Sequence, residues 1–159
     1  MNMKRSILFV CTANQCRSPM AEAIMKDYLN NMDLKNEWEV QSAGTWAESG
    51  FPATAFGIKA MAERGLDTSG HSSQPVRSEL LNQNDLILTM EEGHKEAIQV
   101  EFPAVRHKVF LLSEMAEVKT NIEDPIGGSF EDYLNTANEI DEWIQKGMPK
   151  ILSILNFSE

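Results

Sequence analysis

The stretch ILFVCTANQCRSPMAEA, residues 7–23, carries the strongest structural signal in this chain. Its first four residues form a short run of branched and aromatic side chains, which is typical of a buried strand. A polar loop follows, and then a helical pattern in which a proline comes directly after Ser18, as at many helix N-termini. We therefore predict a strand, a loop and a helix in immediate succession, with Ser18 as the N-cap and Glu22 in the first helical turn.

The same alternation of strands and helices continues along the chain. Apolar runs predict strands at 38–43, 85–90 and 108–112, and helical patterns occupy 53–64 and 91–102. A long amphipathic helix is expected from Ser129, with Asp132 as its capping partner and a kink or interruption at Gly147 and Pro149. Because strands that alternate with helices form parallel βαβ units, we predict an α/β fold. We expect a single domain over residues 1–159, a three-layer sandwich with a four-stranded parallel sheet flanked by helices.

Composition and charge limit the classes of function. The 159 residues include 24 acidic and 14 basic side chains, a net charge of −10, which argues against a protein that grips nucleic acid or an anionic membrane. The apolar run at 7–10 is shorter than a secretory signal needs, and no segment approaches the roughly 20 apolar residues of a membrane span. We expect a monomeric cytoplasmic protein that binds neither nucleic acid nor membranes.

The metal-binding side chains are few. The two cysteines, Cys11 and Cys16, cannot form a disulfide framework or a four-thiolate zinc site. His94 falls in a polar helical stretch and His107 precedes a predicted strand, so neither completes a metal-binding pattern with the other or with the cysteines. We predict that the protein uses no metal and no organic cofactor.

The loop after the first strand is predicted to bind an anion. Backbone N–H groups of a short loop at a helix N-terminus form a concavity of partial positive charge. Arg17 follows Cys11 with five residues between them, and its planar guanidinium can grip two phosphate oxygens. Cys11 would lie at the base, where the amides and the Ser18 hydroxyl favour the nucleophilic thiolate. The predicted phosphate-binding residues are Thr12, Ala13, Asn14, Gln15, Cys16, Arg17 and Ser18. The alternative interpretation is a packed cysteine and an exposed arginine.

The string VCTANQCRSPMAEA, residues 10–23, resembles the signature of the low-molecular-weight protein tyrosine phosphatases. That superfamily also contains protein arginine phosphatases and thioredoxin-linked arsenate reductases. Three further segments match in the same order: Ser42–Gly44, Gly70–Ser73 and the Asp124-Pro125 loop before the last helix. The resemblance implies that Cys11 attacks phosphorus, that Arg17 binds the phosphoryl group, and that Asp124 acts as acid and then as base.

The resemblance also implies roles for neighbouring residues. Asn14 would hold a left-handed loop conformation, supported by Ser42 and His71 together with Ser18. Partial desolvation and the charge of bound phosphate would hold Asp124 protonated, although Asp-Pro is also an ordinary turn. Cys16 could capture oxidised Cys11 as a disulfide, or be a simple packing residue. The expected substrate cleft comprises Gln15, Trp46 and Ile126.

Two positions depart from the family pattern. Ala13 stands where many relatives have glycine, so the backbone must accommodate a Cβ atom. Ile126-Gly127-Gly128 replaces the tyrosines that follow Asp-Pro in eukaryotic members, and the chain has only Tyr28 and Tyr133.

Four functions compete. The first is hydrolysis of phosphotyrosine in a phosphorylated protein, which we favour, and the second is hydrolysis of phosphoarginine by the same nucleophile. In the family, the residue at Gln15 is commonly isoleucine or leucine in tyrosine phosphatases and threonine in arginine phosphatases, so Gln15 matches neither. Arsenate reduction is disfavoured because no cysteine follows Cys16 to carry the disulfide onward. A non-catalytic phosphopeptide-binding module is disfavoured by the joint presence of Cys11, Arg17 and Asp124.

Overall fold

The computed structural model describes residues 4–156 and contains one four-stranded parallel sheet. The strands are β1 (Arg5–Cys11), β2 (Trp38–Gly44), β3 (Leu86–Thr89) and β4 (Val109–Leu111), and their order in the sheet is β2-β1-β3-β4. All four lie where the sequence predicts them, and their edges differ by at most two residues. The single-domain expectation for 1–159 includes chain ends that lie outside the described residues.

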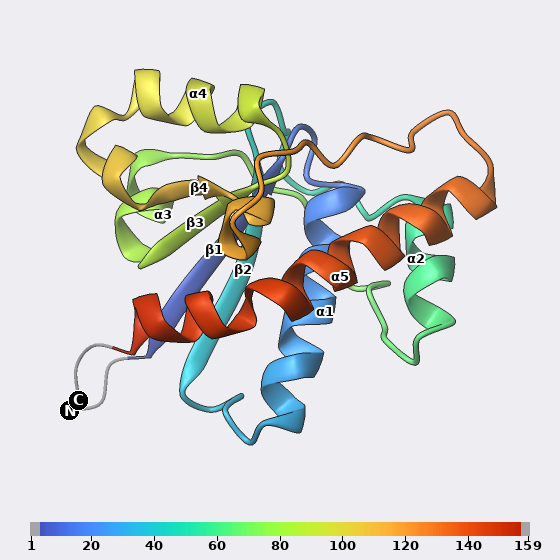
Figure 1. Cartoon of the computed structure of the whole chain (residues 1–159). Coiled ribbons are helices and arrows are strands. Elements are labelled where there is room, and N and C mark those ends of the chain that lie inside the picture. Colours follow the sequence, from blue (N-terminus) through green and yellow to red (C-terminus); the bar gives the residue numbers. More distant parts are fainter. Residues whose placement is uncertain (1–3, 157–159) are drawn as a thin grey trace.

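Helices cover both faces of the sheet, as Figure 1 shows. They are α1 (Arg17–Asn31), α2 (Ala55–Ala62), α3 (Ser78–Gln83), α4 (Glu92–Glu101) and α5 (Phe130–Leu155), with short 3-10 helices η1 (Pro103–Lys108) and η2 (Leu112–Ala116). The helices α1 and α5 pack on one face, and α3 and α4 pack on the other. The predicted three-layer α/β sandwich is confirmed.

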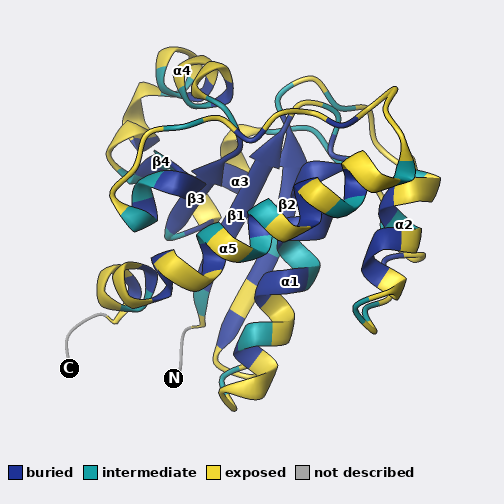
Figure 2. Ribbon diagram, turned by 45° about the vertical axis from the view of Figure 1, so that its right-hand side comes forward, coloured by how far each residue is buried: buried dark blue, intermediate teal, exposed yellow. Residues whose placement is uncertain are grey.

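Strand β1 forms the centre of both cores. Ile7 and Phe9 face the α1 and α5 layer, whereas Leu8 and Val10 face the α3 and α4 layer. All four side chains are fully buried, and Figure 2 shows most of the sheet in dark blue. A strand buried on both faces has to be apolar at every position, which explains the continuous apolar run in the sequence.

Helix α5 starts as predicted and continues past Pro149. Ser129 is its N-cap, and the Ser129 hydroxyl and the Asp132 carboxylate each accept the other residue's backbone N–H. Pro149 lies inside the helix, which is assigned without interruption to Leu155, and Figure 2 shows its C-terminal end turning away from the main axis. A kink is therefore present and an interruption is not. Ile151 and Leu155, beyond the proline, are fully buried, and this packing holds the last turns in place.

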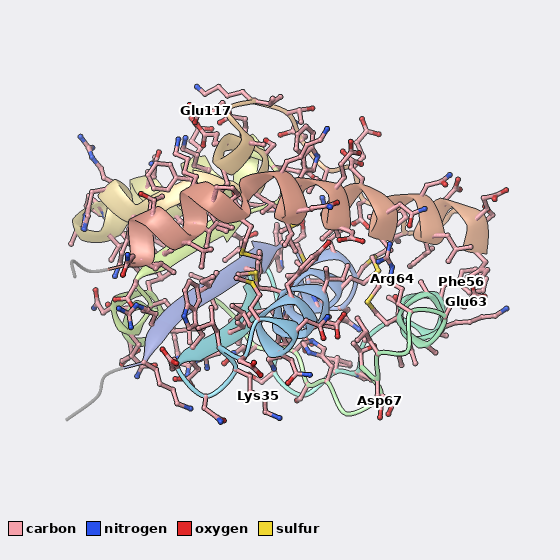
Figure 3. All side chains as sticks on the ribbon, turned by 60° about the horizontal axis from the view of Figure 1, so that its bottom comes forward. Lys35, Phe56, Glu63, Arg64, Asp67 and Glu117 are labelled. Carbon is pink, nitrogen blue, oxygen red and sulfur yellow. The ribbon has the colours of Figure 1, made fainter. Side chains whose placement is uncertain are left out.

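Helix α2 docks against the first half of α5. The Phe56 ring meets the rings of Phe130 and Tyr133 at centroid distances of 5.6 and 5.4 Å. At the other end of α2, Arg64 reaches α5, where its Nη1 donates to Asp141 Oδ2 at 2.8 Å; Figure 3 labels both Phe56 and Arg64. Within residues 4–156, no helix is long and apolar enough to cross a membrane.

Candidate active site

The loop that joins β1 to α1 lies at the carboxyl ends of β1 and β3. In the sheet order β2-β1-β3-β4 the chain leaves β1 toward β2 on one side and later returns to β3 on the other. Open parallel α/β sheets bind ligands in the crevice that this reversal creates. Cys11 is the last residue of β1, and Glu91 comes two residues after β3, so both are positioned at this crevice.

Ser18 contacts the sulfur of Cys11 with both its polar groups. Its hydroxyl oxygen lies 3.0 Å from Cys11 Sγ, and its backbone N–H donates to the same sulfur at 3.4 Å. The prediction that Ser18 is the N-cap is wrong. The N-cap is Cys16, without a side-chain capping bond, and Glu22 lies beyond the first turn. The Ser18 hydroxyl does not cap the helix because it serves Cys11 and also accepts from Asn14.

Asn14 has a φ of 58°, the left-handed conformation that the resemblance implied. Its amide nitrogen donates to the hydroxyls of Ser18 and Ser42 at 2.8 and 2.9 Å. Its amide oxygen accepts the backbone N–H of Gln74 at 2.9 Å, and its carbonyl accepts from His71 Nε2 at 2.7 Å. The structure thus brings Asn14, Ser18, Ser42 and His71 together, and these bonds hold the loop from beneath.

The loop is also fixed by a close approach of β2. A Cβ atom on Gly44 would lie 2.3 Å from the carbonyl oxygen of Thr12 and 2.9 Å from the amide nitrogen of Asn14. Only glycine fits at this position. Ala13 is absent from the residues with positive φ, so its extra Cβ atom causes no strain of that kind.

Arg17 is 2% exposed and is held along one side of its guanidinium. Nη1 forms an ion pair with Glu91 and donates to the carbonyl of Ile122 at 2.7 Å. Nη2 makes only long contacts, at 3.4 Å to Thr12 Oγ1 and 3.5 Å to Asp124 Oδ2, and the buried Nε has no hydrogen-bond partner. The Nε–Nη2 edge is therefore the one that can grip a phosphoryl group bidentately.

The segment that carries Asp124 is anchored to the end of β3. The N–H of Ile122 donates to the carbonyl of Met90 at 2.9 Å, and its own carbonyl accepts from Arg17. Two residues later, the Asp124 carboxylate faces Arg17 and also accepts the N–H of Ile126 at 3.1 Å. Gly127, with a φ of 87°, completes the turn. Asp124 is thus a long ion-pair partner of Arg17, with 3.5 Å between its Oδ2 and Arg17 Nη2.

Two residues next to Arg17 were not assigned a role from the sequence. Glu91, the N-cap of α4, pairs with Arg17, and the buried His94 contacts Thr12 Oγ1 through Nε2 at 2.8 Å. Burial, and to a lesser extent the charge of Arg17, lowers the pKa of His94 to about 4. The signal for Glu91 was its place directly after a buried strand, at the edge where Cys11 also emerges. Neither contact can be derived from spacing, because α4 lies far along the chain.

The other predicted residues occupy different parts of the site. Cys16 is buried, and desolvation, reinforced by the charges of Asp124 and Cys11, raises its pKa to about 12. Gln15 Nε2 donates to the carbonyl of Pro52 at 3.1 Å. Trp46 is 84% exposed, and its backbone N–H donates to the carbonyl oxygen of Thr12. Ile126 is 54% exposed.

Among residues 4–156 there is no cluster of three or more His, Cys, Asp or Glu side chains that could hold a metal.

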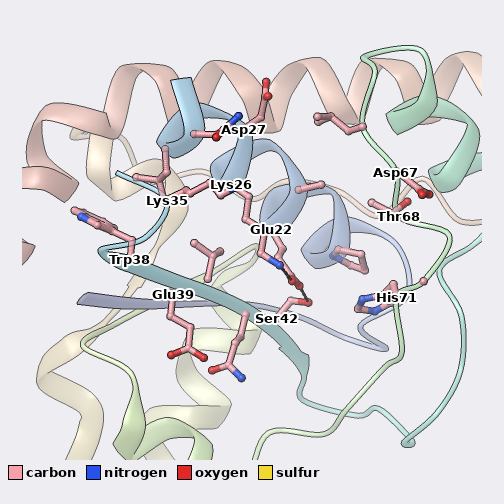
Figure 4. A pocket seen from close by; sticks show the side chains of 18 of the residues that line it. Glu22, Lys26, Asp27, Lys35, Trp38, Glu39, Ser42, Asp67, Thr68 and His71 are labelled. Carbon is pink, nitrogen blue, oxygen red and sulfur yellow. Dashed lines mark hydrogen bonds and ion pairs between the residues drawn. The ribbon is translucent and has the colours of Figure 1, made fainter. Parts of the chain in front are cut away.

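We call the loop between β1 and α1, residues 12–16, the phosphate loop. A cavity of about 900 Å³ lies behind it, between α1, β2 and residues 66–74. Figure 4 shows Ser42 and His71, which both hold Asn14, on its wall. The Ser42 hydroxyl donates to Glu22 Oε1 at 2.6 Å, and Glu22 in turn pairs with Lys26. Ser42 and His71 therefore both hold Asn14 and line this cavity.

Comparison with known proteins agrees with this geometry. Residues 6–153 match the family model described as low molecular weight phosphotyrosine protein phosphatase. The chain is 38% identical to the protein-arginine-phosphatase of Bacillus subtilis over 141 residues, 88% of this chain and 92% of the relative. It is 37% identical to the probable low molecular weight protein-tyrosine-phosphatase EpsP of Ralstonia solanacearum over 148 residues, 91% of this chain and 97% of that one.

The fold agrees equally well with solved structures. A mutant of the YwlE arginine phosphatase with a phosphorylated active-site serine superposes with a TM-score of 0.87 at 36% identity, covering 93% of this chain and 95% of the other. Vibrio vulnificus Wzb in complex with benzylphosphonate superposes with a TM-score of 0.83 at 36% identity, covering 93% and 99%. With sequence, fold and loop geometry in agreement, the chain belongs to the low molecular weight phosphotyrosine protein phosphatase family.

Proposed function

We propose that this chain is a cytoplasmic protein-tyrosine phosphatase that hydrolyses phosphotyrosine in proteins through a phosphocysteine at Cys11. The observation that supports it most directly is the convergence of three groups. The Ser18 hydroxyl and backbone N–H lie against the Cys11 sulfur, Arg17 reaches the same loop with its Nε–Nη2 edge, and Asp124 borders that edge. These are the nucleophile, the phosphoryl clamp and the proton donor that the reaction requires.

In the first step the Cys11 thiolate attacks phosphorus, the P–S bond forms, and the P–O bond to the tyrosine ring breaks. The phosphoryl oxygens take the Nε–Nη2 edge of Arg17, which releases Asp124 from its contact with Nη2. Asp124, protonated in this complex, gives its proton to the departing phenolate. Arg17 and the loop amides stabilise the charge that the equatorial oxygens carry in the transition state.

In the second step a water molecule attacks phosphorus and Asp124 accepts a proton from it. The P–S bond breaks, which regenerates the Cys11 thiolate and releases inorganic phosphate. The Ser18 hydroxyl and amide stabilise this thiolate as a leaving group. The relative with a phosphorylated active-site serine supports a covalent phospho-enzyme of this kind.

The test measures phosphate release from an aryl phosphate and from phosphotyrosine peptides. Cys11→Ser should abolish turnover, and Asp124→Asn should lower kcat by about 10²- to 10⁴-fold, since general acid–base catalysis contributes about that much. Lys146→Ala, at an exposed position of α5, serves as the control and should retain wild-type rates. Wild-type turnover in Cys11→Ser would end the proposal.

Phosphoarginine is the second candidate substrate, supported by a relative named as a protein-arginine-phosphatase. Because Gln15 donates its amide N–H to Pro52, its amide oxygen remains available to accept a hydrogen bond from a guanidinium. The nucleophile would be the same, but a P–N bond would break. Parallel assays on phosphotyrosine and phosphoarginine peptides decide between the two, and Gln15→Leu should lower activity on phosphoarginine selectively. A large wild-type preference for phosphoarginine would make that the substrate.

We also propose that Cys16 captures oxidised Cys11 as a reversible disulfide. Attack of the Cys16 thiolate on the Cys11 sulfenic acid forms the S–S bond and breaks the S–O bond, and the departing hydroxide takes up a proton from solvent to become water. Since the pKa of Cys16 is raised to about 12, its thiolate fraction grows with pH across the neutral range. After peroxide treatment, thiol reductant should restore more activity in wild type than in Cys16→Ser, and the difference should increase from about pH 6 to about pH 8.5, as the thiolate fraction rises. Equal recovery in both proteins would assign Cys16 to packing alone.

A further inference from the structure

Thr12 follows the nucleophile directly, and its side chain is exposed at the cradle. Its hydroxyl oxygen lies 2.8 Å from His94 Nε2 and 3.4 Å from Arg17 Nη2. Arg17 in turn contacts Asp124 through the same Nη2 nitrogen. The hydroxyl therefore contacts Arg17, the proposed phosphoryl clamp, through the same nitrogen that contacts Asp124, the proposed proton donor.

The direction of the Thr12–His94 hydrogen bond follows from the other ring nitrogen. The backbone N–H of Glu91 donates to His94 Nδ1 at 3.1 Å, so Nδ1 is an acceptor and carries no proton. In a neutral imidazole the proton is then on Nε2, which must be the donor toward Thr12. The groups that face this ring are Arg17, Glu91 and Asp124, and its burial keeps it neutral around pH 7.

The Thr12 hydroxyl has one hydrogen-bonding function left, which is to donate its own proton. A hydroxyl oxygen accepts two hydrogen bonds and donates one. Both acceptor positions are taken, by His94 Nε2–H and by Arg17 Nη2–H. Its own proton cannot return to either donor and must point away from them.

We propose that His94 is a positioning residue that fixes the Thr12 hydroxyl so that its proton is donated to a phosphoryl oxygen of the substrate. Thr12 would thereby add a side-chain donor to the ring of loop amides and Arg17. This inference rests on the proposed function for its catalytic consequence, but not for the hydrogen-bond geometry itself. It assigns Thr12 and His94 a joint role beyond the Cys11, Arg17 and Asp124 set.

Paired variants separate this role from the capping of α4. His94→Asn keeps an acceptor near the Nδ1 position for the Glu91 N–H but removes the donor to Thr12. Thr12→Val removes the hydroxyl at nearly constant shape, and Thr12→Ser retains it. We expect His94→Asn and Thr12→Val each to lower kcat/KM about five- to tenfold, the effect of losing one neutral hydrogen bond. The double variant should lose no more than the worse single one, and Thr12→Ser should recover most of the rate.

Two further readouts do not depend on turnover. Nitrogen chemical shifts of His94 should report a neutral ring protonated at Nε2 at about pH 7. Titration with inorganic phosphate should show weaker binding, by a similar factor, in Thr12→Val than in wild type and Thr12→Ser. Proton on Nδ1, additive losses in the double variant, or a Thr12→Ser variant as poor as Thr12→Val would overturn the inference. If wild type turns over no phosphomonoester, the proposed function fails, while the shifts and the phosphate titration still decide the role of Thr12.

Discussion

Single side chains around the phosphate loop each satisfy several partners. Asn14 donates two hydrogen bonds from its side-chain nitrogen and accepts through its amide oxygen and its backbone carbonyl. The Ser18 hydroxyl contacts both Cys11 and Asn14. Buried polar groups cost free energy unless they are hydrogen-bonded, so a connected set of this kind holds one loop shape. The exception beside this loop is Nε of Arg17, which lacks a partner in the place where a phosphate oxygen would bind.

Burial of His94 makes stability depend on pH. Its pKa falls from 6.5 to about 4 in the folded protein, so between these values the unfolded chain binds the proton more readily. The contribution of neutral His94 to the free energy of unfolding is complete above about pH 6.5. It is lost as the pH falls toward 4, which lowers the free energy of unfolding by roughly 3 kcal/mol. Denaturant unfolding at about pH 7 and about pH 4.5 should therefore show a smaller acid loss for His94→Asn than for wild type.

His107 is the matched control for this experiment, because it is exposed. His107→Asn should show the same acid loss as the wild-type protein. If His94→Asn also loses as much stability as wild type between the two pH values, then His94 is not the group that titrates.

Sequence reasoning at the residue scale worked where partners are close along the chain and failed where they are not. The Cys11-to-Arg17 loop was placed correctly because strand, loop and helix are consecutive. The capping role of Ser18 was wrong because propensity alone ranks it as a helix cap, whereas the folded site supplies Cys11 and Asn14 as alternative partners. Glu91 and His94 were missed because their contacts cross from β3 and α4 to the loop.

Secondary-structure elements bring these residues together through the ends of parallel strands. The registers pair Cys11 with Gly44 and Val10 with Thr89, so β1, β2 and β3 end at the same edge. The loop, the segment after β3 and the Asp124 turn all lie at that edge. Boundaries were predicted well for strands, since their apolar runs end sharply. The effect of Pro149 was harder to predict. Proline disfavours a helix, but the burial of Ile151 and Leu155 stabilises the turns that follow it.

The approach of β2 to the phosphate loop gives a prediction at this scale. Gly44→Ala would place a Cβ atom against Thr12 O and Asn14 N, and overpacking of this kind costs about 1–3 kcal/mol. Because the displaced atoms belong to the cradle, kcat/KM should fall at least about tenfold. Urea unfolding and phosphate release measure the two effects.

Gly93→Ala is the matched control, because Gly93 is exposed within α4 and a methyl group there would meet no neighbouring side chain or loop within 4 Å. This change should leave activity intact and stabilise the protein by up to about 1 kcal/mol. Unchanged turnover in Gly44→Ala would show that β2 does not constrain the loop.

At the scale of the whole molecule, the proposed phosphate site lies within a strongly negative protein. The net charge is −10, and in the proposed mechanism Arg17, the loop amides and the N-terminus of α1 would bind the phosphoryl group. Attraction for phosphate is therefore local, while the summed field repels acidic partners at longer range.

The effect of the protein's negative electrostatic field can be tested by comparing kcat/KM for phosphotyrosine peptides that have basic or acidic flanking residues. At low ionic strength the basic peptide should have a kcat/KM about tenfold higher, mainly through KM, because the overall field favours its approach. The ratio should shrink toward one at about 0.5 M salt, where charges are screened within a few ångströms. A preference that survives high salt would indicate specific contacts with the flanking residues instead.

By itself, the sequence determined the layers, the parallel sheet and the loop between β1 and α1, because these depend on local patterns and on consecutive elements; the roles of Cys11 and Arg17 stay predictions. Tertiary structure alone decided how the loop is held and which edge of the Arg17 guanidinium lacks close partners. It also showed that His94, a buried histidine of α4, contacts Thr12, the residue after Cys11. Such contacts join residues far apart along the chain, as the 82-residue separation of Thr12 and His94 shows. They arise only when burial and strand register fix both partners in space.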